Sequence, residues 1–202
     1  MINIPNRYDL LWKMVDVCFQ VIPEGLLLHG GQTSQYFVDV PLILQHPEYV
    51  ESLLIQMYNL LRADELYTKD TQGVNFISID TGGSVIAAAF QSFLSFTHST
   101  DIPLFRVDKT GKIDDIPSIR QKTFILVDDV ITTGKSLLPL VKHIKDQGGT
   151  ILQAVTVVNR SAEGAGFGDR LLAEQGVPLS SVFTLEECIL MYAVRRVNEK
   201  NG

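Results

Sequence analysis

The residues best suited to chemistry are two adjacent carboxylates, Asp128 and Asp129, within the stretch TFILVDDVITTGKS at residues 123–136. They follow a short apolar run at residues 124–127, which is typical of a strand buried on both faces of a parallel sheet. A loop of small or hydroxylated residues comes next, and a helix with apolar periodicity follows it. This order directs backbone N–H groups and a helix N-terminus at an anion, which the backbone at Gly134 can approach closely. The stretch therefore predicts an anion-binding loop with an acidic pair at its mouth.

The last four residues of the stretch, TGKS, end like a Walker A motif, but the spacing excludes that motif. A Walker A loop needs a glycine five positions before Gly134, and Asp129 occupies that position. An acidic pair beside the loop would repel a triphosphate. It suits instead a ligand that presents hydroxyl groups to the carboxylates and a phosphate to the loop. A ribose 5-phosphate presents both groups.

The segment VDDVITTGKS resembles the phosphoribosyl-pyrophosphate (PRPP) motif of type I phosphoribosyltransferases. The resemblance implies that PRPP is bound by the following residues: Asp128, Asp129, Val130, Ile131, Thr132, Thr133, Gly134, Lys135 and Ser136. A second buried strand, at residues 76–79, is followed by Thr81, Gly82 and Gly83 and then by a helix. In the family the equivalent loop holds pyrophosphate. Two such loops at the ends of buried strands match the place where open α/β sheets bind ligands.

Residues 26–40 are typical of a β-hairpin, with strands at 26–28 and 36–40. The pattern is similar to the N-terminal hood of orotate phosphoribosyltransferases, which covers the base. The resemblance assigns base contacts to Phe37 and Val38. His29 stands where the family usually has a lysine, so the resemblance gives it a PRPP contact.

A further strand is predicted at residues 151–158, and Arg160 follows it. Orotate phosphoribosyltransferases have a similar strand whose arginine grips the orotate carboxylate. A guanidinium can pair with a carboxylate through two parallel hydrogen bonds, which is the physical reason for an arginine at this place. The resemblance therefore assigns base binding to Arg160, and also to Thr132 in the PRPP motif.

Residues 107–115 are polar and contain a glycine, which predicts an exposed loop between two buried strands. The resemblance makes this loop the catalytic flap, which closes over pyrophosphate. Arg106 matches the first arginine of the flap pattern, and either Lys109 or Lys112 supplies the later cation. Val107 stands where the family has a lysine, and the flap histidine has no clean counterpart.

Length and composition indicate one globular domain in a reducing compartment. The chain has 202 residues, of which 46% are hydrophobic and 20% charged, with a net charge of −6. This charge argues against nucleic acid or an anionic membrane as a partner. The two cysteines have no metal-binding spacing and predict no disulfide. With no signal peptide and no apolar run of membrane-spanning length, the chain is expected to be cytoplasmic.

The predicted fold class is α/β: a central, mostly parallel sheet flanked by helices, with a Rossmann-like core and a small N-terminal hood. Amphipathic helices are predicted at residues 8–21 and 46–63, each from apolar residues that repeat at three and four positions. The hood covers about residues 1–45 and the core about residues 46–202. Together they are expected to form a single phosphoribosyltransferase-like domain.

The resemblance implies an enzyme that transfers the 5-phosphoribosyl group of PRPP to a nucleobase. The base suggested is orotate, giving orotidine 5′-phosphate and pyrophosphate in pyrimidine biosynthesis. It further implies a homodimer and Mg²⁺ held chiefly by the substrate, with Asp128 and Asp129 reaching it through water. Two alternatives remain open. One is transfer to another base such as a purine. The other is a PRPP-binding regulator without activity, which the altered flap and hood residues keep open.

Overall fold

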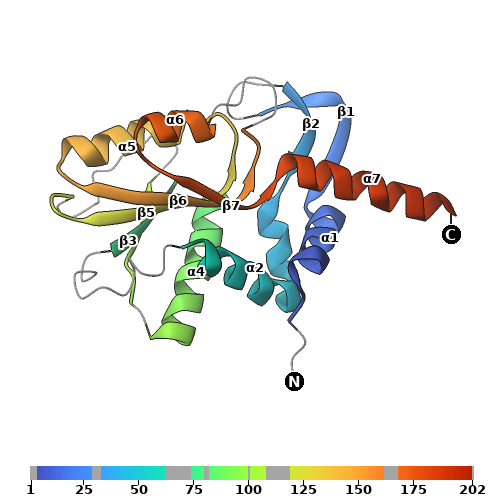
Figure 1. Cartoon of the computed structure of the whole chain (residues 1–202), viewed down its shortest axis with the longest axis horizontal. Helices are drawn as coiled ribbons and strands as arrows, with labels where there is room; N and C mark the ends of the chain where they lie inside the picture. Colours follow the sequence, from blue (N-terminus) through green and yellow to red (C-terminus); the bar gives the residue numbers. More distant parts are fainter. Residues whose placement is uncertain are drawn as a thin grey trace.

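A parallel sheet between two layers of helices forms the body of the molecule (Figure 1). The computed structural model describes residues 4–28, 33–61, 74–79, 82–99, 101–107, 119–161 and 168–201. The strands of the sheet are β3 (Val74–Ile79), β4 (Leu104–Val107), β5 (Thr123–Ile131), β6 (Thr150–Asn159) and β7 (Leu179–Thr184). Their order is β4-β3-β5-β6-β7, and every neighbouring pair is parallel. The predicted α/β class is confirmed.

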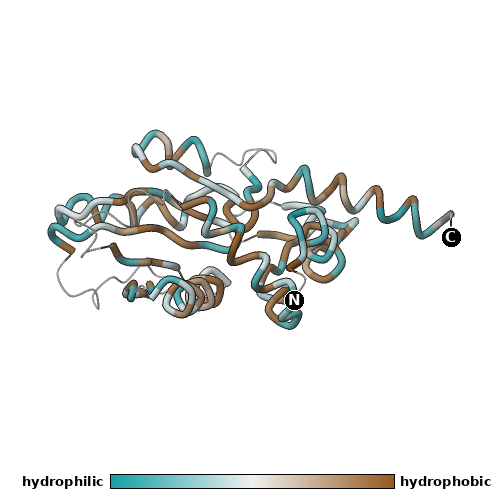
Figure 2. Tube along the Cα trace, turned by 60° about the horizontal axis from the view of Figure 1, so that its bottom comes forward, coloured by the Kyte–Doolittle hydropathy of each residue, from teal (hydrophilic) through white to brown (hydrophobic). Residues whose placement is uncertain are grey.

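The helices cover both faces of this sheet, which explains why its strands are continuous apolar runs. On one face lie α2 (Pro47–Leu60) and α4 (Gly82–His98), and α4 packs on β3 and β5. On the other face lie α5 (Leu137–Asp146) and α6 (Gly168–Glu174), which contact β6 and β7 respectively. In Figure 2 the strands of the sheet carry long brown stretches, whereas the helices around them alternate between teal and brown along their length.

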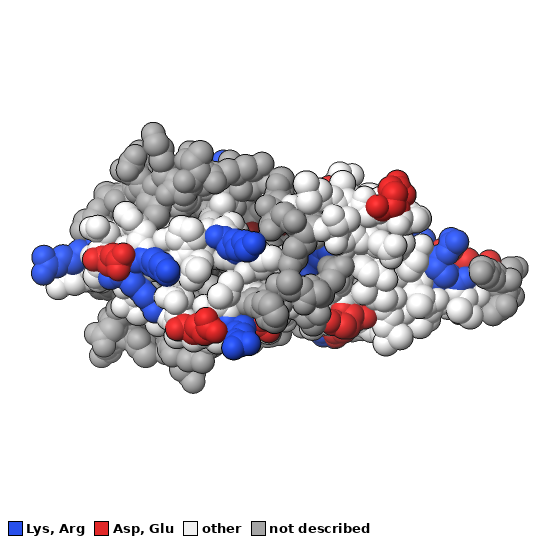
Figure 3. Space-filling view, turned by 90° about the horizontal axis from the view of Figure 1, so that it is seen from above, with Lys and Arg blue, Asp and Glu red and all other residues white. Residues whose placement is uncertain are grey.

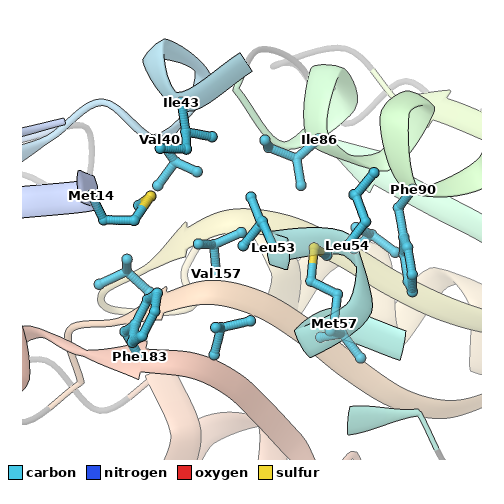
Figure 4. Packing of buried hydrophobic residues seen from close by; sticks show 14 of the residues in the cluster. Met14, Val40, Ile43, Leu53, Leu54, Met57, Ile86, Phe90, Val157 and Phe183 are labelled. Atoms are coloured by element: carbon cyan, nitrogen blue, oxygen red, sulfur yellow. The ribbon is translucent and has the colours of Figure 1, made fainter. Parts of the chain in front are cut away.

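Of the two hydrophobic clusters among the described residues, the larger joins the N-terminal segments to the sheet (Figure 4). It includes side chains from α1 (Arg7–Val17), the 3-10 helix η1 (Val40–Gln45), α2, α4 and β7. Its members include the side chains of Met14, Ile43, Leu53, Phe90 and Phe183, each at most 1% exposed. Because these side chains interdigitate, apolar packing sets the position of the hood residues relative to the sheet.

The hood contains a two-stranded antiparallel sheet, formed by β1 (Phe19–Leu27) and β2 (Thr33–Val38). The helix predicted at residues 8–21 was too long at its C-terminal end, because α1 stops at Val17 and β1 begins two residues later. Strand β1 passes through Pro23 and Gly25. A two-stranded sheet has only edge strands, so it accepts a proline, and Gly25 has a φ of +80° where the register shifts.

Strand β5 also continues further than predicted, because it extends beyond the acidic pair to Ile131. Its first half pairs with both β3 and β6, whereas from Val127 onward it pairs with β6 alone. Asp128 and Asp129 therefore belong to a strand that has lost one neighbour, which leaves their side chains room at the edge of a cavity. The predicted helix at 46–63 is shorter in the structure and is α2.

The chain closes with α7 (Leu185–Asn201), whose C-terminal half extends away from the body of the molecule in Figure 1. Its first turns pack beside α1, and Arg7 of α1 forms an ion pair of 2.7 Å with Glu187 of α7. Among the described residues, no helix has the length and apolar character needed to cross a membrane.

Candidate active site

A cavity of about 750 Å³ lies at the carboxyl ends of β3 and β5. The strand order explains its place. The chain runs from β3 outward to β4 and then returns to the opposite side of β3 as β5. Connections therefore leave β3 and β5 in opposite directions, and open α/β sheets bind their ligands at such a switch point. The cavity is lined by Leu28, Phe37, Val38, Asp39, Pro41, Ile79, Gly82, Val85, Arg160 and each residue from Asp128 to Ser136.

The acidic pair sits directly against the N-terminal turn of α4. A Cβ added to Gly82 would lie 2.0 Å from Oδ2 of Asp129, and one added to Gly83 would lie 2.3 Å from Oδ1 of Asp128. Both positions therefore need glycine for close approach and not for an unusual backbone angle. The positive end of the α4 dipole faces the two carboxylates, which favours their charged form.

Burial opposes that charged form. It raises the pKa of Asp128 well above the ordinary value for an aspartate, and the adjacent Asp129 carboxylate raises it further. Burial also raises the pKa of Asp129, and the charge of Asp39 across the cavity adds to that rise. The backbone N–H of Asp129 donates to Oδ1 of Asp128 over 3.0 Å. The cavity thus holds carboxyl groups whose charged form would be stabilised by hydrogen-bond donors or a cation.

The loop after the acids is shaped to hold an anion. Gly134 has a φ of +66°, and its carbonyl accepts from the N–H of Leu137 at 3.1 Å, which turns the chain into α5. The N–H of Gly168, at the start of α6, donates to the carbonyl of Thr132 over 3.1 Å. Ser136 is the N-cap residue of α5, yet its hydroxyl makes no capping hydrogen bond. Ser136 lines the cavity, so its hydroxyl is available to an anion there. The N–H groups of Leu137 and Leu138 both donate to the carbonyl of Gly134, so the amides left for an anion are those of the loop before α5.

Arg160 joins the sheet to the hood. Its backbone N–H donates to the carbonyl of Ile131 over 2.8 Å, and its Nη2 donates to Oγ of Ser34 in β2 over 2.9 Å. Only 3% of the residue is exposed, and it lines the cavity together with Phe37 and Val38 of the same strand β2. A cation, an aromatic ring and a strand backbone thus converge on one side of the cavity.

The structure brings most of the residues predicted from the sequence to this one cavity. The nine residues of the predicted PRPP motif line it, as do Gly82, Phe37, Val38 and Arg160. Gly83 lies just behind, against Asp128. The predicted contacts at His29, Thr81, Lys109 and Lys112 lie outside the described residues. Arg106 is exposed on β4, with β3 between it and β5, and does not line the cavity.

Several lining residues had no assigned role in the sequence analysis, chiefly Asp39. It follows Phe37 and Val38 at the start of η1 and adds a third carboxylate to the cavity. Because Asp39 directly follows the predicted base contacts, the sequence could have predicted that it lies at the site. Val85 of α4 and Ile79 of β3 add apolar lining, and no local pattern distinguishes these two from core residues.

Charge outside the cavity is mixed. Figure 3 looks down on the molecule from the side of α5 and α6, and its lysines and arginines are interspersed with aspartates and glutamates. Among the described residues, the cations that line the cavity are Lys135, which is exposed, and Arg160, which is buried. Recognition of an anion in this cavity would therefore rest on these local groups and on oriented backbone amides.

Comparisons with known proteins agree with this geometry. Residues 61–165 match the model of the phosphoribosyl transferase domain. The orotate phosphoribosyltransferase of Methanopyrus kandleri is 31% identical over 165 residues, which are 80% of each chain. That of Sulfurisphaera tokodaii is 29% identical over 185 residues, covering 88% of this chain and 87% of the relative.

A crystal structure of orotate phosphoribosyltransferase from Aeropyrum pernix superposes with a TM-score of 0.66 at 26% identity. The match covers 91% of this chain and 96% of the other. The matched domain includes the acidic pair, the anion-binding loop and Arg160, and the similarity to whole relatives extends beyond it. The chain belongs to the phosphoribosyl transferase family and, within that family, groups with the orotate phosphoribosyltransferases.

Proposed function

We propose that this protein transfers the 5-phosphoribosyl group of PRPP to orotate, giving orotidine 5′-phosphate and pyrophosphate. The observation that carries the proposal is the convergence of three kinds of group on one cavity: the acidic pair, the anion-binding loop, and Arg160 beside Phe37. The relatives that support it are named orotate phosphoribosyltransferases. A solved orotate phosphoribosyltransferase from Mycobacterium tuberculosis, which shares the fold at 23% identity and a TM-score of 0.62, is a complex with PRPP.

The proposed roles follow the arrangement of donors and acceptors. The loop from Thr132 to Ser136 holds the 5-phosphate, while Asp128 and Asp129 accept hydrogen bonds from the ribose hydroxyls. Phe37 and the backbone of Val38 position the base, and Arg160 pairs with its carboxylate. The reaction breaks the C1–pyrophosphate bond and forms a bond from C1 to a ring nitrogen. The protein's task is to align these two atoms, neutralise the departing charge and exclude water.

The remaining predicted contacts complete this proposal. His29, Thr81 and Gly82–Gly83 contact PRPP. Arg106 does not line the cavity of its own subunit, so we assign it, with Lys109 or Lys112, to the departing pyrophosphate in the partner's site of the dimer proposed below. The charge of orotate at neutral pH lies on its carboxylate, so the ring nitrogen that bonds to C1 still carries a proton. That proton leaves as the C1–N bond forms, and the departing pyrophosphate, itself a base, can accept it, so no side chain is assigned as general base.

Mg²⁺ fits the donors of the cavity. Carboxylate oxygens are the ligands it prefers, and Mg²⁺ commonly retains water and binds through substrate phosphates as well as one or two protein carboxylates. Among the residues that the structure describes, no group of three or more side chains forms a ready metal site. We therefore assign Mg²⁺ to the substrate, within reach of Asp128 and Asp129 through water. When bound, it would neutralise charge on the pyrophosphate.

The test of the activity is release of pyrophosphate from Mg²⁺–PRPP that depends on added orotate. We expect release with orotate and none with hypoxanthine or adenine, because a neutral purine has no carboxylate for Arg160. Release with a purine alone would establish the other enzymatic function. PRPP binding without release for any base would show a regulator that lacks catalysis.

Gly83→Ala should impair both stability and PRPP binding. The added Cβ would meet Oδ1 of Asp128 and also its Cα, 3.2 Å away, so rotation of the carboxylate alone cannot make room. We expect a loss of about 1–3 kcal/mol in the free energy of unfolding, as for other overpacked sites, and at least a tenfold weaker PRPP affinity. Thermal unfolding and calorimetry measure the two effects.

Gly176→Ala provides the matched control. Gly176 has a φ of +66° and nothing within 4 Å of the added Cβ, so this variant loses stability through backbone strain only. It should bind PRPP as the wild type does. If Gly83→Ala also retained wild-type PRPP affinity, the close contact between α4 and Asp128 would have no part in binding.

We further propose that the chain is a single domain, hood plus core, that works as a homodimer with the hood at the interface. The cluster shared by α1, η1, α2, α4 and β7 supports one folding unit. Strand β1 presents apolar side chains to solvent at Val21, Leu26 and Leu27, which are 37%, 38% and 70% exposed. Such side chains on a two-stranded sheet, which is marginal alone, favour coverage by a second copy.

Mixing two inactive variants tests whether the flap acts across this dimer. One variant carries Lys109→Ala and Lys112→Ala, and the other carries Asp128→Asn. If the flap of one subunit completes the site of its partner, heterodimers contain one site with an intact motif and an intact flap. After subunit exchange, about a quarter of wild-type activity should return. Mixtures that stay inactive after verified exchange would exclude the arrangement, as would a monomer in light scattering.

A further inference from the structure

Thr156 carries a buried hydroxyl whose polarity is not needed for the packing of the sheet. It lies in the middle of β6 and is 0% exposed, between the buried valines Val155 and Val157. Its Oγ1 is buried and makes no hydrogen bond within the described part of the chain. Valine has the same shape and would fill this place without a polar atom. Buried hydroxyls without a partner are rare, and each needs an explanation.

The register of the sheet places this hydroxyl beside the acidic pair. Thr156 is the direct neighbour of Asp128 across the parallel strands β5 and β6. Adjacent strands are about 4.8 Å apart, and paired residues point to the same face of the sheet. A threonine hydroxyl at this separation can reach a neighbouring carboxylate by rotation about one bond. Oδ1 of Asp128 already accepts from the N–H of Asp129, which leaves acceptor positions on the carboxylate for a second donor.

We propose that Thr156 is a positioning residue for PRPP binding, whose hydroxyl donates to the Asp128 carboxylate when that carboxylate is charged and holds the ribose. This inference rests on the proposed function, because it assigns Asp128 to the ribose hydroxyls. The donor compensates for the loss of water around a carboxylate that burial disfavours. It also fixes the carboxylate plane relative to the ligand. Thr156 does not line the cavity, so it acts through Asp128 and does not touch the substrate.

Ser181 offers a matched control at the same level of the sheet. It pairs with Thr156 from the other side, on β7, one strand further from Asp128. If the Thr156 hydroxyl only stabilised the sheet, removing the hydroxyl of Thr156 or that of Ser181 would have similar effects on PRPP affinity. If the Thr156 hydroxyl donates to Asp128, removing the Thr156 hydroxyl weakens PRPP binding and removing the Ser181 hydroxyl does not.

The experiment compares Thr156→Val, Thr156→Ser and Ser181→Ala in the full chain, by calorimetric titration with Mg²⁺–PRPP and with inorganic phosphate. Thr156→Val should bind PRPP about tenfold more weakly, as expected for loss of one hydrogen bond to a charged group, and should unfold at the wild-type temperature or higher. Thr156→Ser keeps the hydroxyl and should bind within about threefold of wild type. Ser181→Ala should match wild type. Phosphate affinity should be unchanged in all three, since phosphate has no ribose.

Three results would count against the inference. PRPP affinity within about twofold of wild type in Thr156→Val would overturn it while leaving the proposed function intact. Equal weakening of PRPP and phosphate in that variant would show a general distortion of the loop, and so a structural role. A wild-type protein that does not bind PRPP would overturn the proposed function and this inference together.

Discussion

Replacing Asp128 and Asp129 together with asparagine is expected to abolish PRPP binding while making the ligand-free protein more stable at neutral pH. The loss follows because each carboxylate is assigned hydrogen bonds to the ribose, directly or through the water of Mg²⁺. Two hydrogen bonds to charged groups contribute about 3 kcal/mol or more, which corresponds to an affinity at least 100-fold weaker. Isothermal calorimetry with Mg²⁺–PRPP measures the loss, and unchanged affinity would refute the assignment of the acidic pair.

The gain in stability follows from the direction of the pKa shifts. Burial raises the pKa of both carboxyls in the folded protein above the unfolded value, so the folded state binds more protons. The stabilisation that results is present in full below the unfolded pKa, about 3.9, and is lost as the pH rises through the folded-state pKa. Asparagine does not titrate, so the double variant lacks this pH dependence of the free energy of unfolding. The melting temperature of the double variant minus that of wild type should therefore increase between about pH 4 and pH 8.

Asp101→Asn with Asp146→Asn is the control for that measurement, because both carboxylates are exposed and lie outside the cavity. This pair of changes removes the same charge, and the difference from wild type should stay nearly constant with pH. A similar pH trend in the control would assign the effect to net charge and not to the buried pair.

Replacing Arg160 with alanine should weaken the binding of orotate far more than the binding of PRPP. Only orotate has a carboxylate for the guanidinium, and loss of a charge-assisted pair costs about 1.5–3 kcal/mol, or about 10- to 100-fold in affinity. Arg160→Lys keeps the charge but not the two-pronged geometry, so its orotate affinity should be intermediate. Steady-state KM values for orotate and PRPP, together with direct PRPP titration, separate the two substrates.

Arg160 is buried and donates to Ser34, so its removal also disturbs the hood. Ser34→Ala removes the accepting hydroxyl and keeps the cation, which makes it the matched control. If the main role of Arg160 is to pair with orotate, Ser34→Ala should retain most of the orotate affinity. Equal losses of orotate and PRPP in Arg160→Lys, reproduced by Ser34→Ala, would show that Arg160 serves mainly to hold the hood in place.

The sequence by itself determined the chemistry of the site to a large extent. The run at 123–136 contains its own strand, acidic pair, loop and helix start, so one short window of sequence carries the pattern for each part. The α/β class also followed from local signals, since buried parallel strands are continuous apolar runs between helical repeats. Phe37 and Arg160 came from their resemblance to family patterns, and the structure places both beside the cavity.

Local signals were weaker at the hood. Cys18 and Phe19 continue the apolar repeat of α1, and the strand conformation that begins at Phe19 depends on pairing with β2. The helical spacing of apolar residues continues past the end of α1 at Val17 and into the first residues of β1. The sequence pattern therefore predicted a helix that continued to residue 21. Pairing energy from a second strand, which no local window contains, decided the outcome.

Only the tertiary structure decided which of these segments meet. The return of the chain from β4 to the far side of β3 puts Gly82 and Gly83 against an acidic pair about 45 residues later, and it leaves Arg106 on the edge strand. The same packing places Asp39 of the hood across from Asp129, and sets Thr156 beside Asp128. Strand order and hood position depend on the shared hydrophobic cluster, whose members lie far apart in the chain. Periodicity shows which face of a segment is apolar, but the partner of that face is chosen by the packing of the whole cluster.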